Sequence, residues 1–476
     1  MKTYLPVVVS VAVSAALWLF GTGLHPYPGI VALAPLPVLL IASRVPRRIA
    51  FAAALVSWLA GAIPFAVYFS RTLEQPPLPT ILLLGGTALT YAALITVTGT
   101  LIRRGRAGAA LLTLPAGWAL MEFLFSATGL FGAWWSLAYT QTEVLPLIQI
   151  AAVTGRLGIC FLILLIPAAV TVLIDDRVPR QQRIRCAVGV CAVGVAVAGY
   201  GSWRLSAPAG PDSVPIALVA VAQPDDFVPV DTPEGHDMII RVVAEVERVA
   251  DHGARVVVLP EKSWRADEAT LPVLAGPLTD VALRRDVHIV AGLVLSRGET
   301  SVNAAIDFPS GLVYAKQHLV AGWEAELVPG TRLAPVPGTD WAMAVCFDLD
   351  FPDLVRANRN QGASLLLVPA LDFRDDHWMH SRMAVLRGVE SGVGVARVAQ
   401  LGDLVLSDAN GRIRATAPAD FTRTASVLAT VTQPADPTPY ARFGEWFAVL
   451  IGLMFAFTVL TTVRTRGGDD NHERAS

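Results

Sequence analysis

The sequence predicts a polytopic α-helical membrane domain joined to an α/β external domain. Of its 476 residues, 54% are hydrophobic and only 16% are charged, and the mean hydropathy is +0.53. Long apolar stretches fill the first part of the chain and recur near its end, as membrane spans require. Between them the pattern changes to short strands, amphipathic helices and turns. The net charge of −2 argues against a nucleic-acid partner, which needs a basic field.

Seven apolar stretches precede the external region, and an eighth follows it. A transmembrane helix needs roughly 20 mostly apolar residues. The stretches cover residues 4–24, 27–43, 49–70, 80–102, 109–129, 157–174, 186–203 and 446–463. The predicted domains are a membrane domain with seven transmembrane helices (1–206), an external domain (207–435), a linker with a C-terminal transmembrane helix (436–463) and a cytoplasmic tail (464–476).

Arginine clusters predict the orientation. They follow the second, fourth and sixth stretches, and they comprise Arg44, Arg47 and Arg48; Arg103, Arg104 and Arg106; and Arg177, Arg180, Arg183 and Arg185. Because basic loops stay in the cytoplasm, both termini are expected inside and residues 207–435 on the extracytoplasmic side. Arg71, Arg156 and Arg204 are isolated exceptions on the outer side.

Two features of the membrane half each allow two interpretations. Glu122 lies within the fifth stretch, where a carboxyl group is costly and marks either a functional site or a hydrogen-bonded packing residue. Trp118, one helical turn away, is the expected packing partner. The aromatic loop 131–141 either anchors the protein at the membrane interface or shapes an entrance for lipid.

The external domain alternates strands with helices, which predicts a layered α/β fold. Strands are expected at 216–222, 256–259, 288–295, 304–307, 312–316, 343–347, 365–368, 394–398, 404–407 and 425–430, and helices at 236–251, 352–361 and 381–389. Pro434, Pro437 and Pro439 make the linker stiff.

Cys346 is the candidate nucleophile of this domain. Of the chain's four cysteines it alone lies in the external domain, so no disulfide partner is available within that domain. It follows an apolar strand and precedes a helix that begins near Pro352, in the stretch WAMAVCFDLDFPDLVR. A thiol beside a helix N-terminus is expected to have a lowered pKa. The alternative is an unreactive buried cysteine.

Charged residues at two other strand ends favour the reactive interpretation. Glu261 follows a buried strand in VVVLPEKSW, and Lys316 ends another strand in LVYAKQHLVAGWE. Glu324 lies in the loop after Lys316. Ligand sites form where strands end at one edge of a sheet. Three strand ends therefore deliver a carboxylate, an ammonium and a thiol.

The stretches around Glu261, Lys316 and Cys346 resemble the Glu–Lys–Cys motif of the nitrilase superfamily and, within it, the apolipoprotein N-acyltransferase family. The loop glutamate of that family falls on Glu324. The membrane half resembles the same family at Trp118, Glu122, Trp135, Tyr139, Gln141, Gln149 and Gly155. The resemblance implies an αββα sandwich for the external domain, in a multi-pass protein of the bacterial cytoplasmic membrane.

The resemblance also implies the chemistry. Cys346 attacks an acyl carbonyl and forms a thioester, Glu261 acts as the base, and Lys316 stabilises the oxyanion. Glu324, Phe347 and Asp348 have supporting roles, with the backbone N–H near Phe347 as a second oxyanion donor. The implied acyl donor is a membrane phospholipid and the acceptor is a diacylglyceryl lipoprotein. No metal or organic cofactor is implied. A membrane-tethered amidase is the alternative function, and an inactive membrane scaffold is a third.

The sequence departs from the family around the site. Phe347 and Asp348 stand where the family has Tyr and Glu, and the lysine loop reads Ala-Gly-Trp-Glu where the family has Pro-Phe-Gly-Glu. Phe125 replaces an arginine after the membrane glutamate, and residues 400–403 lack an Asn-rich turn. The motif itself is intact, while the residues expected to contact substrate differ.

Overall fold

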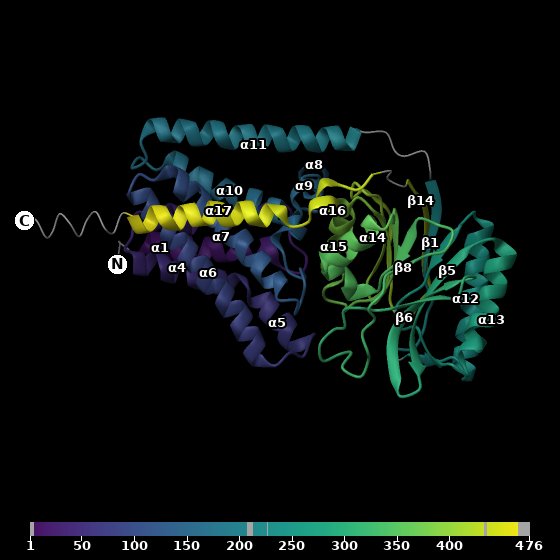
Figure 1. Ribbon diagram of the computed structural model, residues 1–476. Helices are drawn as coiled ribbons and strands as arrows, with labels where there is room; N and C mark the ends of the chain where they lie inside the picture. Colours follow the sequence, from purple (N-terminus) through teal and green to yellow (C-terminus); the bar gives the residue numbers. More distant parts are fainter. Residues whose placement is uncertain (1–3, 207–212, 226, 433–435, 465–476) are drawn as a thin grey trace, which may run out of the picture. The chain divides into compact units, whose positions relative to one another are not determined.

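The computed structural model describes residues 4–206, 213–225, 227–432 and 436–464, which form two compact units (Figure 1). One unit comprises Met1–Leu205 and Glu445–Ser476, and the other is Ser206–Gly444. The first unit is helical and the second is α/β, which confirms the predicted fold class. Residues 207–212, residues 433–435 and the tail beyond Arg464 lie outside the described residues.

The helical unit contains five described helices that are long and apolar enough to cross a membrane. These are α1 (Leu5–Thr22), α6 (Pro77–Arg103), α7 (Ala107–Ala127), α10 (Arg156–Ile174) and α11 (Arg180–Ser206). A sixth span results if α4 (Arg47–Gly61) and α5 (Ile63–Arg71), which meet at a 46° bend, are counted together. The break lies at Ala62, and Pro64 follows in the first turn of α5, where its ring and missing N–H prevent α4 from continuing as a regular helix.

One of the eight predicted spans is shorter in the structure. The second is broken into α2 (Ile30–Leu33) and α3 (Leu36–Ala42) around Pro35. At 1.5 Å per residue this segment spans only about 20 Å of a hydrocarbon core that is about 30 Å thick. The last span, α17 (Trp446–Arg464), covers the predicted stretch 446–463. The eight-span topology stays a prediction, in which the second span is a short crossing.

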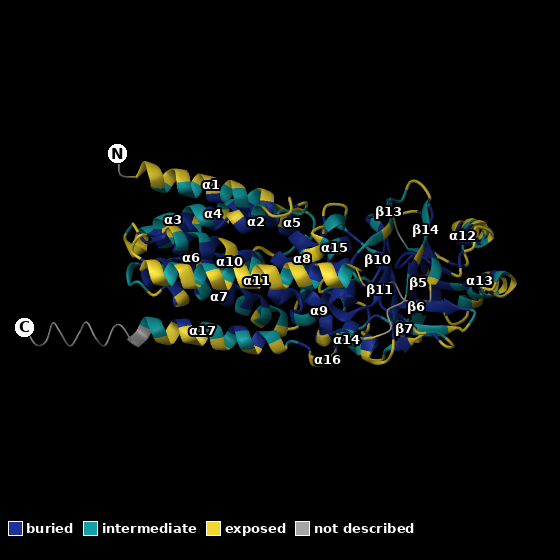
Figure 2. Cartoon of the chain, turned by 90° about the horizontal axis from the view of Figure 1, so that it is seen from above, coloured by how far each residue is buried: buried dark blue, intermediate teal, exposed yellow. Residues whose placement is uncertain are grey.

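Small residues allow the membrane helices to pack closely. A Cβ on Gly61 would lie 2.3 Å from the Cβ of Trp18, and one on Gly99 would lie 2.6 Å from the backbone of Ala42. Such close approach is the usual basis of helix association in lipid. By contrast, α11 is exposed along almost its whole length and buries only Gly201 among its residues (Figure 2). The short elements η1 (Leu137–Gln141), α8 (Leu145–Ile148) and α9 (Ala151–Thr154) complete the unit.

Two mixed sheets form the α/β unit. The first has the strand order β14-β1-β3-β5-β4-β2, with β6 paired to β5 and β7 paired to β6. Its strands are β1 (Ser213–Ala220), β2 (Val228–Pro229), β3 (Val256–Val258), β4 (Trp264–Asp267), β5 (His288–Arg297), β6 (Thr300–Phe308), β7 (Leu312–Ala315) and β14 (Ala425–Thr432). The second has the order β13-β12-β11-β10-β9-β8. Its strands are β8 (Ala334–Pro335), β9 (Trp341–Met343), β10 (Leu365–Leu371), β11 (Gly394–Gln400), β12 (Asp403–Ser407) and β13 (Ile413–Pro418).

The sheets pack face to face, and a pair of helices covers each outer face. One apolar core lies between the sheets and contains side chains of β1, β3, β9, β10 and β11. A second core joins the first sheet to α12 (Pro233–Asp251) and α13 (Leu271–Arg285), and a third joins the second sheet to α14 (Pro352–Asn360) and α15 (His377–Ser391). This is the expected αββα sandwich. The short helix α16 (Pro439–Phe443) ends the unit.

Most predicted elements of this unit are present, with three differences. The helix α13 was not predicted because Pro272, Gly276 and Pro277 interrupt its pattern; the structure places Pro272 in its first turn, where no N–H is needed. The edge strand β13 and the short strands β2, β4 and β8 were also missed. The strand expected at 343–347 is wrong: β9 ends at Met343, and Cys346 begins a 3-10 helix, η2 (Cys346–Asp350).

Candidate functional site

Glu261 is fixed by contacts with both sheets. It lies three residues beyond the end of β3 and is 2% exposed. Its backbone N–H donates to the carbonyl of Ala370 in β10, at 3.2 Å. Gly292 in β5 is required for this path, because a Cβ there would lie 2.6 Å from the Cα of Glu261. The carboxylate is therefore held at the ends of strands from two sheets.

Lys316 forms an ion pair with Glu261. It follows β7 directly and is 1% exposed, and its Nζ lies 2.9 Å from Glu261 Oε1 and 2.9 Å from Glu324 Oε2. Burial alone would lower the pKa of this ammonium, but the charges of Glu261 and Glu324 raise it above its ordinary value. Lys316 is therefore a fixed positive charge at any physiological pH.

Asn303 bridges the two glutamates. It lies in β6, is fully buried, and its Nδ2 donates to Glu261 Oε1 at 2.5 Å and to Glu324 Oε1 at 2.7 Å. Its backbone carbonyl accepts the backbone N–H of Lys316 at 2.8 Å. Asn303 was not among the site residues predicted from the sequence. The available signal was a polar side chain next to the apolar segment Ala304–Ile306 of a strand, because a buried amide needs a polar partner.

Glu324 lies in the loop after β7, as expected, and it is as buried as Glu261. It accepts the backbone N–H of Val320 at 2.8 Å and pairs with Lys262 Nζ at 2.6 Å. Burial would raise the pKa of Glu324, but Lys316 and Lys262 bring it down to about 2. Glu324 is therefore an ionised carboxylate held from three sides. Lys262 was not among the residues singled out from the sequence.

Cys346 occupies a strained turn. Its φ of 44° lies in the left-handed region, which residues with a Cβ seldom adopt and which is often associated with functional sites. The residue is half-buried, and its Sγ donates to the carbonyl of Leu371 at 3.6 Å. The turn thus presents the thiol at the end of β10, in the same region as Glu261.

The expected lowering of the Cys346 pKa is wrong. Burial and the neighbouring Glu261 carboxylate raise the pKa of this thiol well above its ordinary value, and Lys316 and Arg397 only partly offset them. The η2 turn separates Cys346 from the first turn of α14, where the sequence had placed the stabilising helix dipole. These shifts favour the neutral thiol of Cys346 at neutral pH.

Asp348 joins the cysteine turn to the lysine loop. It is fully buried and accepts hydrogen bonds from the Tyr314 hydroxyl at 2.7 Å, the His318 N–H at 2.9 Å and the Val345 N–H at 3.1 Å. The ring of Phe347 is half-buried and lies perpendicular to Phe351, at 5.3 Å. Asp348 thus sets the separation of Lys316 and Cys346.

A buried charge pair behind the thiol was also missed. Asp372, just after β10, pairs with both terminal nitrogens of Arg397 in β11, and His380 approaches Asp372 Oδ1 at 3.4 Å. This pair could not be predicted from the sequence, because its members are far apart along the chain. Within the described residues, no group of three or more His, Cys, Asp or Glu side chains is placed to hold a metal ion.

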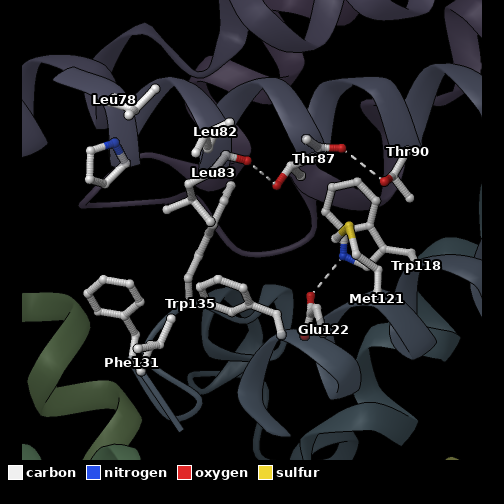
Figure 3. Close-up of a pocket in the computed structure, with 14 residues that line it drawn as sticks. Leu78, Leu82, Leu83, Thr87, Thr90, Trp118, Met121, Glu122, Phe131 and Trp135 are labelled. Atoms are coloured by element: carbon white, nitrogen blue, oxygen red, sulfur yellow. Dashed lines mark hydrogen bonds between the residues drawn. The ribbon is translucent and has the colours of Figure 1, made fainter. Parts of the chain in front are cut away.

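Glu122 has the predicted partner in the helical unit. Trp118 Nε1 donates to Glu122 Oε1 at 2.8 Å, as Figure 3 shows. Ser136 Oγ, the Leu137 N–H and Cys160 Sγ also donate to this carboxyl, at 2.7, 3.1 and 3.1 Å. These four donors occupy both oxygens, which supports the packing interpretation. Glu122 ties the loop before η1 to α7 and α10.

A cavity of about 540 Å³ lies against Glu122, between α6, α7 and the loop that contains Trp135. Its lining is mostly aliphatic and aromatic. The hydroxyls of Thr87 and Thr90 donate to the carbonyls of Leu83 and Gly86 on their own helix (Figure 3). Because these polar groups are already hydrogen-bonded, the cavity offers an apolar surface. In the same loop, Trp134 is buried against Tyr68 and is a packing residue rather than an interfacial anchor.

Comparisons with known proteins match both units. Residues 6–169 match the apolipoprotein N-acyltransferase N-terminal domain, and residues 217–432 match the carbon-nitrogen hydrolase family. The chain is 27% identical to the apolipoprotein N-acyltransferase of Geobacter metallireducens, covering 89% of each protein. It is 26% identical to that of Shewanella oneidensis, covering 70% of each. Among solved structures, an amidase of the nitrilase superfamily from Nesterenkonia matches 48% of this chain and 93% of its own, with 21% identity and a TM-score of 0.40.

The raised pKa of Cys346 leads to a first prediction. The thiolate absorbance that is lost in Cys346→Ala should be absent at neutral pH and should emerge only above the ordinary thiol pKa of 9.0. Difference ultraviolet titration of the two purified proteins measures this directly. A thiolate signal already complete at neutral pH would mean that a persistent thiolate–ammonium pair exists instead.

Proposed function

The chain belongs to the apolipoprotein N-acyltransferase family, and on this premise we propose that it transfers a fatty acyl group from a phospholipid to the N-terminal amine of a diacylglyceryl-cysteine lipoprotein through a thioester on Cys346. It is an enzyme and a multi-pass protein of the bacterial inner membrane. The amidase alternative is not favoured, because the N-terminal match and the curated relatives are those of acyltransferases.

One observation carries the assignment of roles. The Lys316 ammonium and the Glu261 carboxylate form a buried ion pair at 2.9 Å, and both shift the pKa of the Cys346 thiol. A base and a fixed cation thus flank a neutral nucleophile. Acyl transfer requires this set: a proton acceptor for the thiol and a positive charge for the developing oxyanion.

In the first half-reaction, Cys346 Sγ attacks the ester carbonyl of the phospholipid while Glu261 takes the thiol proton. The oxyanion forms beside Lys316, with the backbone N–H near Phe347 as a second donor. The intermediate then expels the lysophospholipid oxygen, which receives the proton from Glu261, and the thioester remains. In the second half-reaction, the acceptor amine attacks the thioester, and its proton passes through Glu261 to the departing sulfur.

Glu261, rather than Glu324, is proposed as the base. A general base works best when its pKa lies near the working pH. The pKa of Glu324 is lowered to about 2, and two ammonium groups already bind its carboxylate. Both contacts of Glu261 with described side chains, by contrast, are made through Oε1. Its second oxygen is left for proton transfer, and Glu324 supports the arrangement.

The cavity beside Glu122 is proposed to hold an acyl chain of the donor phospholipid. It lies in the helical unit, its polar side chains are hydrogen-bonded within the protein, and its volume falls in the range of small-molecule sites. Trp135 in its wall agrees with the interpretation of the aromatic loop as a lipid entrance. Glu122 then acts indirectly, by holding that wall in place.

The catalytic unit is proposed to lie on the extracytoplasmic side, with both termini in the cytoplasm, because of the three arginine clusters. Arg156, one of the outer-side exceptions, is paired with Glu445 at 3.1 Å and is buried, so it does not count as a free basic loop residue.

A topology reporter tests this orientation. Alkaline phosphatase fused after Leu205 should be active, since it folds only outside the cytoplasm, and the same fusion placed within the loop around Arg104 should be inactive. The reverse pattern would place the catalytic unit inside the cell and overturn the proposed access to lipoproteins.

Covalent catalysis predicts an acyl-enzyme. After incubation with phospholipid alone, intact-mass analysis should show one added fatty acyl group on the wild type and none on Cys346→Ala. Glu261→Gln should slow thioester formation by roughly 10²–10⁴-fold, which is the usual contribution of general-base catalysis. Transfer activity retained by Cys346→Ala would rule out this nucleophile.

Filling the cavity should change acyl-chain preference. Gly86 lines the cavity, and an added Cβ meets no atom within 4 Å, so Gly86→Phe adds bulk without a backbone clash. Gly85 is equally open but does not line the cavity, so Gly85→Phe is the matched control. With donors of graded chain length, Gly86→Phe should shift preference to shorter chains by about tenfold or more, and Gly85→Phe should not. Identical profiles would exclude the cavity as the acyl site.

A further inference from the structure

Lysine is rare in this chain, and where it occurs is informative. The sequence has 37 basic residues, of which three are lysine: Lys2, Lys262 and Lys316. The other 34 are arginine. The two lysines after Lys2 bind the same carboxylate, that of Glu324. The compact ammonium fits a small buried site where a planar guanidinium does not. Apart from Lys2, the lysines of this chain thus lie at one site, around Glu324.

Lys262 is the second ammonium bound to Glu324. Its Nζ lies 2.6 Å from Glu324 Oε1, and its side chain is 11% exposed. Its φ of 50° lies in the left-handed region, directly after Glu261, so the backbone is strained where it directs this side chain. Glu324 thus has one ammonium on each oxygen, Lys262 on Oε1 and Lys316 on Oε2.

The charge count shows what Lys262 contributes. Glu261 and Glu324 carry two negative charges in a buried site, and Cys346 is a neutral thiol. Without Lys262, the single ammonium of Lys316 would have to neutralise both carboxylates. An incompletely paired buried charge is costly. Glu324 would then draw Lys316 toward itself. During the reaction Glu261 becomes neutral as it takes the thiol proton, and a new negative charge forms at the acyl carbonyl oxygen. This charge would compete with Glu324 for Lys316.

We propose that Lys262 is a positioning residue that neutralises Glu324, so that Lys316 stays available to the oxyanion of the acyl intermediate. This inference rests on the proposed acyl transfer through Cys346. Lys262 itself does not touch the reacting atoms: it acts through Glu324. Its contribution therefore depends on the charge of Glu324, and it disappears when that charge is removed.

A double-mutant cycle tests this dependence. Thioester formation from phospholipid is measured in single turnovers for wild type, Lys262→Met, Glu324→Gln and the double variant, with the full chain in nanodiscs. Lys262→Met should slow acylation about 10–100-fold at saturating phospholipid, with an unchanged half-saturating concentration, as expected for lost oxyanion stabilisation. The double variant should be no slower than Glu324→Gln alone, because no uncompensated carboxylate remains.

Arg265→Met is the matched control. Arg265 and Lys262 both lie over the ring of Phe227, at 5.8 and 5.6 Å, but Arg265 is exposed and makes no contact with Glu324. Its removal should leave the acylation rate unchanged. If Lys262→Met fails to fold, the double variant, which lacks the unbalanced charge, should recover both folding and the Glu324→Gln rate; failure of that recovery overturns the proposal.

Two further outcomes would contradict the positioning role of Lys262. Rate losses that multiply in the double variant would mean that Lys262 acts independently of Glu324. A loss confined to the half-saturating phospholipid concentration would mean that Lys262 binds the lipid phosphate directly. Either result overturns the positioning role while the wild-type thioester still forms. Absence of a thioester in the wild type overturns the proposed function itself, so the two failures are distinguishable.

Discussion

A buried lysine between two buried carboxylates is the interaction on which the catalytic unit depends. Charges removed from water are tolerated only when they are paired and hydrogen-bonded. Lys316, Glu261 and Glu324 meet this condition with distances of 2.9 Å and with Asn303 bridging both carboxylates. The same pairing keeps Lys316 positively charged at physiological pH. The pairing that stabilises these buried charges is therefore also the pairing that the proposed acyl transfer requires.

The αββα sandwich supplies that pairing because several strands end in one region. Glu261 and Asn303 come from the first sheet, and Cys346 follows β9 of the second. Hydrogen bonds across the gap, from Glu261 to Ala370 and from Asp348 to the lysine loop, fix the separation of these groups. These hydrogen bonds thus hold the polar groups of the site in fixed positions. The strained turn at Cys346 persists because the surrounding bonds determine it.

In the helical unit, too, a buried carboxyl group has hydrogen-bond partners for both of its oxygens. Glu122 is a carboxyl group among apolar helices, and four donors satisfy it. Its effect is to fix the loop that carries Trp135 and so to leave an apolar cavity rather than a polar site. Buried carboxyl groups thus differ in role between the two units: Glu261 and Glu324 belong to the proposed catalytic site, and Glu122 holds a loop in place. The difference lies in their partners: a cation and a thiol in the first case, and only neutral donors in the second.

The sequence by itself determined what depends on local pattern. Hydropathy identified the membrane stretches, and strand ends located Glu261, Lys316 and Cys346, because these signals need only neighbouring residues. The tertiary structure alone decided which charges meet. Lys262 and Asn303 acquire their partners from strands and loops distant in the chain, and the Cys346 pKa is raised because burial and a carboxylate outweigh a helix end that lies too far away. Pairing and desolvation act through space, so no local pattern of residues reveals them.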